Sequence, residues 1–246
     1  MLTSEELTRY SRQMLIPWLG AEAQERLKSS HVLVAGIGGL GCSSSLFLTS
    51  AGVGSITLVD FDTVGLSDLN RQVIYWHEDI GRKKVDVAAE GLSRLNPDVR
   101  IYPRDAKISE SNVYDLLGVA EIVVDGLDNL GARYILNSAC IKKGIPYIYG
   151  SVLGLRGAMT VIIPGKTPCL RCIYPKERVQ TGPLPVLGSA PAIIANLQVI
   201  EAIKILAKRG PSLAGRMVVF HGDTMKFITL ELKKNEVCEV CGKEQE

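Results

Sequence analysis

Short runs of apolar residues alternate with longer segments of mixed polarity from residue 31 onwards. Each short run is almost continuous in Val, Ile and Leu, which is typical of parallel strands that are covered on both faces. The segments between them are helical stretches that end at Gly, Pro or Asn. This alternation predicts an α/β fold, a Rossmann-like, doubly wound and mostly parallel sheet. The predicted strands are residues 31–37, 55–60, 99–105, 121–128 and 146–152, and the predicted helices are residues 40–51, 83–95, 109–117 and 130–143.

Both ends of the chain depart from this pattern. Residues 4–15 and 20–29 form two short predicted helices before the first strand. After residue 152, residues 156–164 and 215–234 have the pattern of antiparallel strands, with a long helix at about residues 190–208 between them. We therefore expect an antiparallel C-terminal extension of the sheet.

The composition indicates an ordinary globular protein, with 46% hydrophobic residues, 22% charged residues and a net charge of +2. Such a small charge excludes nucleic acid or an anionic membrane as the main partner. The N-terminus lacks the apolar run of a signal peptide. The segment 190–208 contains Asn196, Gln198, Glu201 and Lys204, so it falls short of a membrane span and is predicted to be a core or interface helix. The expected location is the cytoplasm.

A glycine loop follows the first predicted strand and opens a helix. Its sequence GIGGLG contains the pattern G-x-G-x-x-G at Gly36, Gly38 and Gly41. The glycines allow the backbone to approach a phosphate group at the start of the helix. Asp60 ends the next strand, where a carboxylate can accept hydrogen bonds from both ribose hydroxyls. These features predict a nucleotide with a free ribose diol and leave both NAD and ATP open.

Polar residues at the carboxyl ends of the predicted strands favour ATP over NAD. The sequence SDLNRQ (67–72) carries Asn70 and Arg71, and Lys84 begins the following helix. These groups suit phosphate oxygens, and Asp128 is placed to hold Mg²⁺ on a triphosphate. Singly, each is an ordinary surface charge, but together they predict a phosphate site. A hydride-transfer enzyme would need a proton-transferring group beside the substrate, and the three histidines suggest no such arrangement.

Four of the six cysteines form two C-x-x-C pairs, Cys169 with Cys172 and Cys238 with Cys241. Four cysteines favour a tetrahedral Zn²⁺ with no open position, and hence a structural metal. Two redox-active dithiols are the alternative, which is disfavoured because neither pair heads a thioredoxin-like helix.

The other two cysteines are predicted to be packed helix residues. For Cys42 a second interpretation stays open, because a thiol near the start of the helix after the glycine loop can have a lowered pKa. Cys140 lies within an apolar helical pattern.

Motifs along essentially the whole chain resemble the bacterial adenylyltransferases of ubiquitin-like sulfur-carrier proteins. This is the MoeB/ThiF/HesA group, which is related to ubiquitin-activating enzymes. The motif VDFDTV-x-LS most resembles the molybdopterin-synthase branch. The matching motifs are RYSRQM (9–14), AQERL (23–27), VAGIGGLG (34–41), AGVGSITLVDFD (51–62), LNRQ (69–72), DIGRKKV (79–85), LNPDV (95–99), DGLDN (125–129) and the paired C-x-x-C motifs.

The resemblance implies an ATP- and Mg²⁺-dependent adenylyltransferase. The C-terminal glycine of a small carrier protein ending in Gly-Gly would be converted to an acyl adenylate, and a sulfurtransferase would then form the thiocarboxylate used in molybdenum or tungsten cofactor biosynthesis. The implied enzyme is a homodimer in which Arg12 reaches into the neighbouring subunit's site. Judged from the sequence pattern alone, Arg12 is an ordinary charge on the exposed face of the first helix. Arg12, Arg71, Lys84 and Asp128 would be catalytic, with Asp128 on Mg²⁺. The predicted ATP site comprises Gly36, Gly38, Gly39, Gly41, Asp60, Asp62, Ser67, Asp68, Asn70, Arg71, Gln72, Lys84, Asp128 and Asn129.

Two departures from the family pattern bear on activity. Asp68 stands where the family usually has Asn, so a carboxylate that binds through the metal or turns outward replaces an amide. Many relatives also carry a cysteine in the crossover loop after the first C-x-x-C, whereas YPKERVQTGPLP (174–185) has none. Covalent transfer of the carrier through this loop is therefore disfavoured.

We thus expect a single adenylation domain over residues 1–246. Residues 1–30 would be N-terminal helices, residues 31–152 the nucleotide-binding half, and residues 153–246 the antiparallel strands, crossover loop and zinc site. The alternatives are the same reaction on a thiamine-type or other ubiquitin-like carrier, an NAD-dependent oxidoreductase, and a catalytically silent carrier-binding scaffold.

Overall fold

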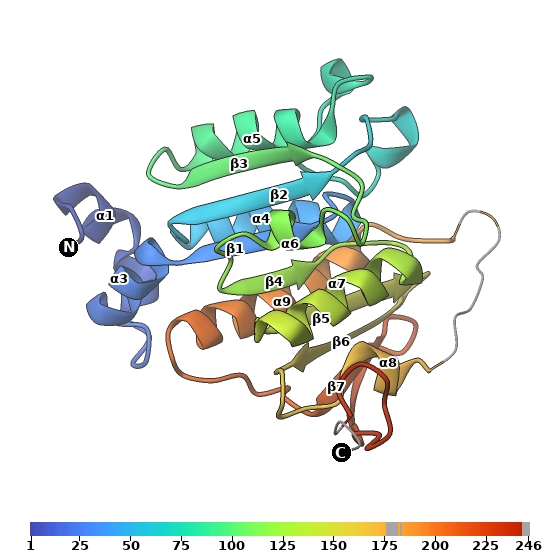
Figure 1. Ribbon diagram of the computed structural model, residues 1–246. Coiled ribbons are helices and arrows are strands. Elements are labelled where there is room, and N and C mark those ends of the chain that lie inside the picture. The colour runs from blue at the N-terminus through green and yellow to red at the C-terminus, as the bar shows by residue number, and fades with distance from the viewer. Residues whose placement is uncertain (176–181, 183, 243–246) are drawn as a thin grey trace.

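A computed structural model describes residues 1–175, 182 and 184–242 (Figure 1). Its strands form one sheet in the order β3-β2-β1-β4-β5-β6-β7-β8. The strands β1 to β5 run parallel, and β6, β7 and β8 continue the sheet antiparallel. The fold class predicted from the sequence is confirmed. The strands are β1 (His31–Ala35), β2 (Ser55–Asp60), β3 (Arg100–Asp105), β4 (Ile122–Asp125), β5 (Tyr147–Leu153), β6 (Arg156–Ile162), β7 (Arg216–His221) and β8 (Lys226–Glu231).

Helices cover both faces of the sheet, with α7 on one side and α4 and α9 on the other (Figure 1). Strand β1 shows why, because Val32 and Val34 pack into one apolar cluster while Leu33 and Ala35 pack into the other, and all are fully buried. The helices are α1 (Ser4–Arg9), α2 (Ser11–Met14), α3 (Ala21–Ser29), α4 (Gly39–Ser50), α5 (Lys84–Leu95), α6 (Val113–Leu117), α7 (Leu130–Lys143), α8 (Leu170–Ile173) and α9 (Ser189–Leu206), with the short 3₁₀ helices η1 (Leu66–Asp68) and η2 (His77–Asp79).

The strand order creates a crevice at the carboxyl ends of β1 and β4. Both β2 and β4 pair with β1 in parallel, but the chain reaches them in opposite directions along the sheet. The loops after β1 and β4 therefore diverge to opposite faces and leave a space between them. In doubly wound sheets this is the place where ligands bind.

The first predicted helix, residues 4–15, is wrong as a single element. The chain leaves helical geometry at Tyr10, which divides it into α1 and α2. The Tyr10 ring is buried directly over Gly52, and its hydroxyl accepts a hydrogen bond of 2.9 Å from Asn96 Nδ2. This tertiary contact outweighs local helix propensity, which is a weak preference.

The predicted helix at residues 109–117 is shorter than expected. Asn112 Oδ1 accepts a hydrogen bond from the Ser109 backbone N–H at 2.9 Å, so the first residues form a turn and α6 begins at Val113. An Asn side chain competes with helical hydrogen bonding in this way.

Helix α9 packs against the sheet as the sequence predicts. By length and composition alone it could cross a membrane, but half of it is buried within the protein. Its polar residues are bonded inside the fold: Gln198 Nε2 donates to the carbonyls of Asp125 and Ile148 at 2.9 and 3.0 Å, and Glu201 accepts from the Leu213 N–H at 2.8 Å. Most of the crossover loop, residues 176–181 and 183, lies outside the described residues.

Candidate functional site

A cleft of about 380 Å³ lies at the carboxyl ends of β1, β2 and β4. Most of the residues predicted to bind ATP line it, although they come from segments far apart in the sequence. These are Gly36, Gly38, Gly39, Asp60, Asp62, Asp68, Arg71, Gln72, Lys84, Asp128 and Asn129.

The glycine loop forms the floor of the cleft because it packs closely against the loop after β4. Gly36 has a φ of 83°, and a Cβ on it would lie 2.7 Å from the carbonyl oxygen of Gly126, in the loop after β4. A Cβ on Gly41 would lie 1.8 Å from the Gly36 carbonyl oxygen. Gly38 differs, because a Cβ there would meet only the Gln72 side chain, 4.0 Å away. The backbone at Gly38 is therefore open to the cleft where α4 begins, which suits a phosphate group, and Gly39 lines the cleft beside it.

Asp60 connects the glycine loop to the loop after β2. Its Oδ2 accepts a hydrogen bond from the Ile37 N–H at 2.6 Å, and its Oδ1 accepts one from the Asp62 N–H at 2.9 Å. The carboxylate therefore braces the backbone of both loops in addition to lining the cleft. Its predicted contact with ribose remains a prediction.

Asp68 points into the cleft and meets the residues predicted to bind phosphate. Its Oδ1 accepts from Gln72 Nε2 at 2.8 Å and from Arg71 at 3.2 Å, and its Oδ2 accepts from the Gly65 N–H at 3.0 Å. Lys84 Nζ lies 3.5 Å from both Asp68 and Asp62. Of the two orientations that the sequence left open, the outward one is wrong.

Asp128 is exposed at the rim, just before α7. Asn129 caps this helix: its Oδ1 accepts from the Ala132 N–H at 2.9 Å, and its Nδ2 donates to Asp128 Oδ1 at 3.2 Å. The side-chain oxygen of Asn129 is thus engaged in the cap, and its amide orients the Asp128 carboxylate.

The remaining predicted residues lie outside the lining of the cleft. Gly41 supports the floor from behind. Ser67 and Asn70 orient the Arg71 side chain, which donates hydrogen bonds to the Ser67 carbonyl at 2.7 Å and to Asn70 Oδ1 at 3.0 Å. Arg12 is exposed on α2, and its side chain forms no hydrogen bond or ion pair with the described part of the chain.

A buried ion pair behind the cleft was missed by sequence reasoning. Arg133 on α7 donates to Asp125 Oδ2 at 2.9 Å, to the Gly150 carbonyl at 2.7 Å and to the Leu127 carbonyl. Burial raises the pKa of Asp125, although Arg133 opposes the shift. The pair ties α7 and β5 to the loop that presents Asp128. Asp125 lies in the motif DGLDN, but nothing local in the sequence indicates that Arg133 turns inward.

The wall of the cleft formed after β2 and β3 was also not predicted. Phe61 follows β2, and Lys107 and Ile108 follow β3, so they reach the same edge of the sheet as the polar residues. The Lys107 ammonium lies 5.7 Å from the centre of the Phe61 ring. Their positions just after two parallel strands are the signal that could have identified them.

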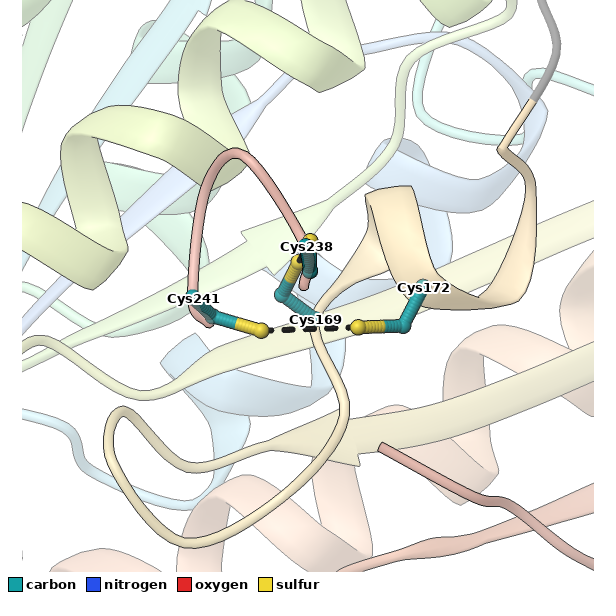
Figure 2. Close-up of side chains that lie close together, drawn as sticks. All are labelled: Cys169, Cys172, Cys238 and Cys241. Atoms are coloured by element: carbon teal, nitrogen blue, oxygen red, sulfur yellow. Dashed lines mark hydrogen bonds between the residues drawn. The ribbon is translucent and has the colours of Figure 1, made fainter. Parts of the chain in front are cut away.

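The four cysteines of the C-x-x-C pairs form one cluster beside α8 (Figure 2). The Sγ atoms all lie within 4.8 Å of one another, with 3.7 Å between Cys169 and Cys238 and 3.4 Å between Cys172 and Cys241. A tetrahedral zinc with Zn–S bonds of about 2.3 Å separates its sulfur ligands by about 3.8 Å. The cluster therefore has the size and donor set that such an ion requires.

The thiols of this cluster differ in acidity. Burial raises the pKa of Cys169. Burial opposes ionisation of Cys238 as well, but the N–H groups of Cys241 and Val240 outweigh it and lower its pKa to about 7. Thiolates are the form that binds a metal.

The two other cysteines are core residues, as predicted. Both are completely buried, and burial raises the pKa of Cys42 to about 12 and that of Cys140 further. The second interpretation of Cys42, a thiol of lowered pKa, is wrong because loss of solvation on burial outweighs the hydrogen bonds that favour the thiolate.

A larger cavity of about 590 Å³ lies beside α6, α7 and α8. It contains Tyr114, Lys142 and Arg171 but neither the glycine loop nor the carboxyl end of a strand. The smaller cleft is therefore the candidate nucleotide site, because helix N-termini and strand ends converge on it.

Comparison with known proteins matches residues 10–240 to the ThiF family. The chain is 36% identical to the molybdopterin-synthase adenylyltransferase of Escherichia coli over 98% of both chains. It is 38% identical to the sulfur carrier protein adenylyltransferase of Thermus thermophilus over 98% of this chain and 93% of that protein. A solved structure of E. coli MccB with ATP superposes with a TM-score of 0.83 at 25% identity, covering 95% of this chain and 74% of that one. Because the family model covers residues 10–240 and both relatives match almost end to end, the chain belongs to the ThiF family.

Proposed function

We propose that this protein adenylylates the C-terminal glycine of a small ubiquitin-like sulfur carrier of the molybdopterin type. The observation that carries the proposal is the cleft itself, where the glycine loop, Arg71, Lys84 and Asp128 meet at the carboxyl edge of the sheet. The names of relatives that match almost end to end support the same reaction.

The chemistry of the cleft is electrostatic. The attacking carboxylate of the carrier and the triphosphate are both anions, so the site must oppose their repulsion as the acyl–phosphate bond forms and pyrophosphate leaves. Arg71 and Lys84 supply positive charge, and the backbone of Gly38 and Gly39, where α4 begins, supplies N–H donors. No general base is needed, because a C-terminal carboxylate is already ionised at neutral pH.

Magnesium would be held at Asp128, where the Asn129 amide keeps the carboxylate at the rim of the cleft. When bound, the ion neutralises phosphate charge. Asp60 remains the predicted ribose contact, and Asp62, whose N–H donates to Asp60, remains a predicted residue of the ATP site.

Zinc is proposed for the cysteine cluster, in a structural role. The cluster joins the turn at Cys169 and Cys172 to the C-terminal segment that carries Cys238 and Cys241, 69 residues further along the chain. A closed set of four sulfur ligands leaves no position for substrate.

We also propose a homodimer in which Arg12 completes the partner's site. Arg12 is exposed, and its side chain forms no hydrogen bond or ion pair with the described part of its own chain. Nearby, the apolar side chains of Leu15 and Ile16 are exposed at 75% and 41%. Apolar side chains next to a free guanidinium are typical of a surface that a second subunit covers. The remaining proposals are a sulfurtransferase that consumes the adenylate, a cytoplasmic location, and one adenylation domain over residues 1–246, which the continuous sheet supports.

The test is ATP–pyrophosphate exchange with purified carriers ending in Gly-Gly, of the molybdopterin and thiamine types, assayed side by side. We expect exchange only when a carrier is present, and the carrier with the highest kcat/KM identifies the pathway. Binding of NADH in place of ATP would instead favour the oxidoreductase. If the protein binds ATP but no carrier supports exchange, the catalytically silent scaffold is the remaining alternative.

A further inference from the structure

The Asp68 carboxylate occupies the part of the cleft where anions are predicted to bind. It contacts Arg71 at 3.2 Å and Lys84 at 3.5 Å, the two cations assigned to phosphate. Its side chain is only 14% exposed. An incoming phosphate group must therefore compete with a carboxylate that is already attached to the protein.

The two cations do not depend on Asp68 for their positions. Arg71 also donates to the Ser67 carbonyl and to Asn70 Oδ1, at 2.7 and 3.0 Å. Lys84 lies equally close to Asp62, and its side chain is 6% exposed, which restricts its movement. Losing the Asp68 charge would leave both cations oriented toward the cleft.

We propose that Asp68 is an internal competitor for phosphate, which pairs with Arg71 and Lys84 in the empty cleft and is displaced by the phosphates of the nucleotide. This inference deepens the proposed function and assumes that the cleft binds ATP. The carboxylate weakens the binding of ATP and of pyrophosphate by the same contacts. It re-forms its ion pairs as pyrophosphate leaves, and so favours release of that product.

The experiment compares the wild-type protein with Asp68→Asn, which keeps the shape of the side chain and an oxygen that can accept from the Gly65 N–H. The affinities of adenosine, ATP and inorganic pyrophosphate are measured by calorimetry on the full chain with Mg²⁺ present. We expect the variant to bind ATP and pyrophosphate roughly three- to tenfold more tightly, since an opposing charge is removed. Adenosine, which has no phosphate, should bind unchanged. In pyrophosphate exchange the KM for ATP should fall without a rise in kcat.

Asp79 provides a matched control. It ends a 3₁₀ helix as Asp68 does, accepts from the Trp76 N–H at 2.9 Å and pairs with Arg82 three residues later at 2.9 Å. It does not line the cleft. Asp79→Asn should therefore leave the affinities of all these ligands unchanged, whatever it does to stability.

Weaker or equal binding of ATP and pyrophosphate by folded Asp68→Asn would overturn the inference, and weaker binding would point to a metal-binding or positioning role. If this variant does not fold, Asp68→Ser, whose hydroxyl can still accept a hydrogen bond, takes its place. Tighter phosphate binding without carrier-dependent exchange would contradict only the proposed function. Normal exchange with unchanged phosphate affinity would contradict only the role of Asp68.

Discussion

The guanidinium of Arg133 donates a hydrogen bond to the Asp125 carboxylate at 2.9 Å, and both side chains are buried behind the nucleotide cleft. The same guanidinium donates hydrogen bonds to the carbonyls of Leu127 and Gly150, so one side chain joins the loop after β4 to β5. Because Asp128 lies at the end of this loop, the buried pair sets the position of a predicted catalytic carboxylate from behind.

Removing one partner of this pair should destabilise the protein strongly. Arg133→Met leaves Asp125 as an uncompensated buried charge, and we expect a loss of about 3–5 kcal/mol in the free energy of unfolding. Urea denaturation measures this. The control is Arg104→Met, which removes an exposed ion pair with Asp115 and should cost less than about 1 kcal/mol. Equal losses in the two variants would contradict a special role for the buried pair.

The cysteine cluster should bind one zinc per chain. Metal analysis of Cys238→Ser should show loss of zinc, because three remaining thiolates bind the ion less tightly. Cys140→Ala removes a buried cysteine outside the cluster and should keep the metal. In the wild-type protein, thiol reagents should reach the clustered cysteines only after a chelator is added. Freely titratable thiols in zinc-free wild-type protein would argue against the structural metal.

The N-terminal helix should make stability depend on pH through Glu6. Burial opposes ionisation of this carboxylate, but hydrogen bonds from Lys28 at 2.7 Å and from Thr3 outweigh it and hold the pKa of Glu6 below its ordinary value of 4.5. A lowered folded-state pKa contributes stability that is present above the unfolded-state value and is lost as the pH falls through the folded-state value. Thermal unfolding of Glu6→Gln should therefore be less sensitive to pH below about 5.

Glu22 is the control for this experiment, because it pairs with Arg26 at 2.6 Å but is 90% exposed. Glu22→Gln should retain the acid sensitivity of the wild-type protein. If Glu6→Gln retained it as well, the lowered pKa of Glu6 would not be its source.

Arg12 should act on catalysis without affecting stability. Since the Arg12 side chain forms no hydrogen bond or ion pair within the described part of its chain, the Arg12→Ala variant should melt at the wild-type temperature. If it reaches into the partner's site as an arginine finger, exchange activity should fall by about 10³-fold. Co-expression of Arg12→Ala with Asp128→Ala should restore activity, because each mixed dimer then has one intact site. Mixed dimers with no activity would argue that Arg12 and Asp128 of one chain serve the same site.

Local pattern was sufficient for the frame of the fold. The runs of Val and Ile in β1 and β2 can only be buried on both faces, and the glycine loop between β1 and α4 has a steric requirement that other residues cannot meet. Of the two elements that local pattern misjudged, one depends on a distant partner and the other on a local side-chain hydrogen bond. Tyr10 breaks the first helix because it packs on Gly52, and α6 begins late because an Asn side chain bonds to the preceding turn.

Spacing and backbone requirements are local properties of the chain, so the strands, the glycine loop, the family and the two cysteine pairs could be identified from the sequence. Three relationships became visible only in the folded chain: Asp68 faces Arg71 and Lys84, Arg133 is buried against Asp125, and cysteines 69 residues apart meet. These relationships need the fold because the interaction between two charges or two sulfur atoms depends on the distance between them in space. That distance follows from the strand order and the loop paths, which no single segment of the sequence encodes.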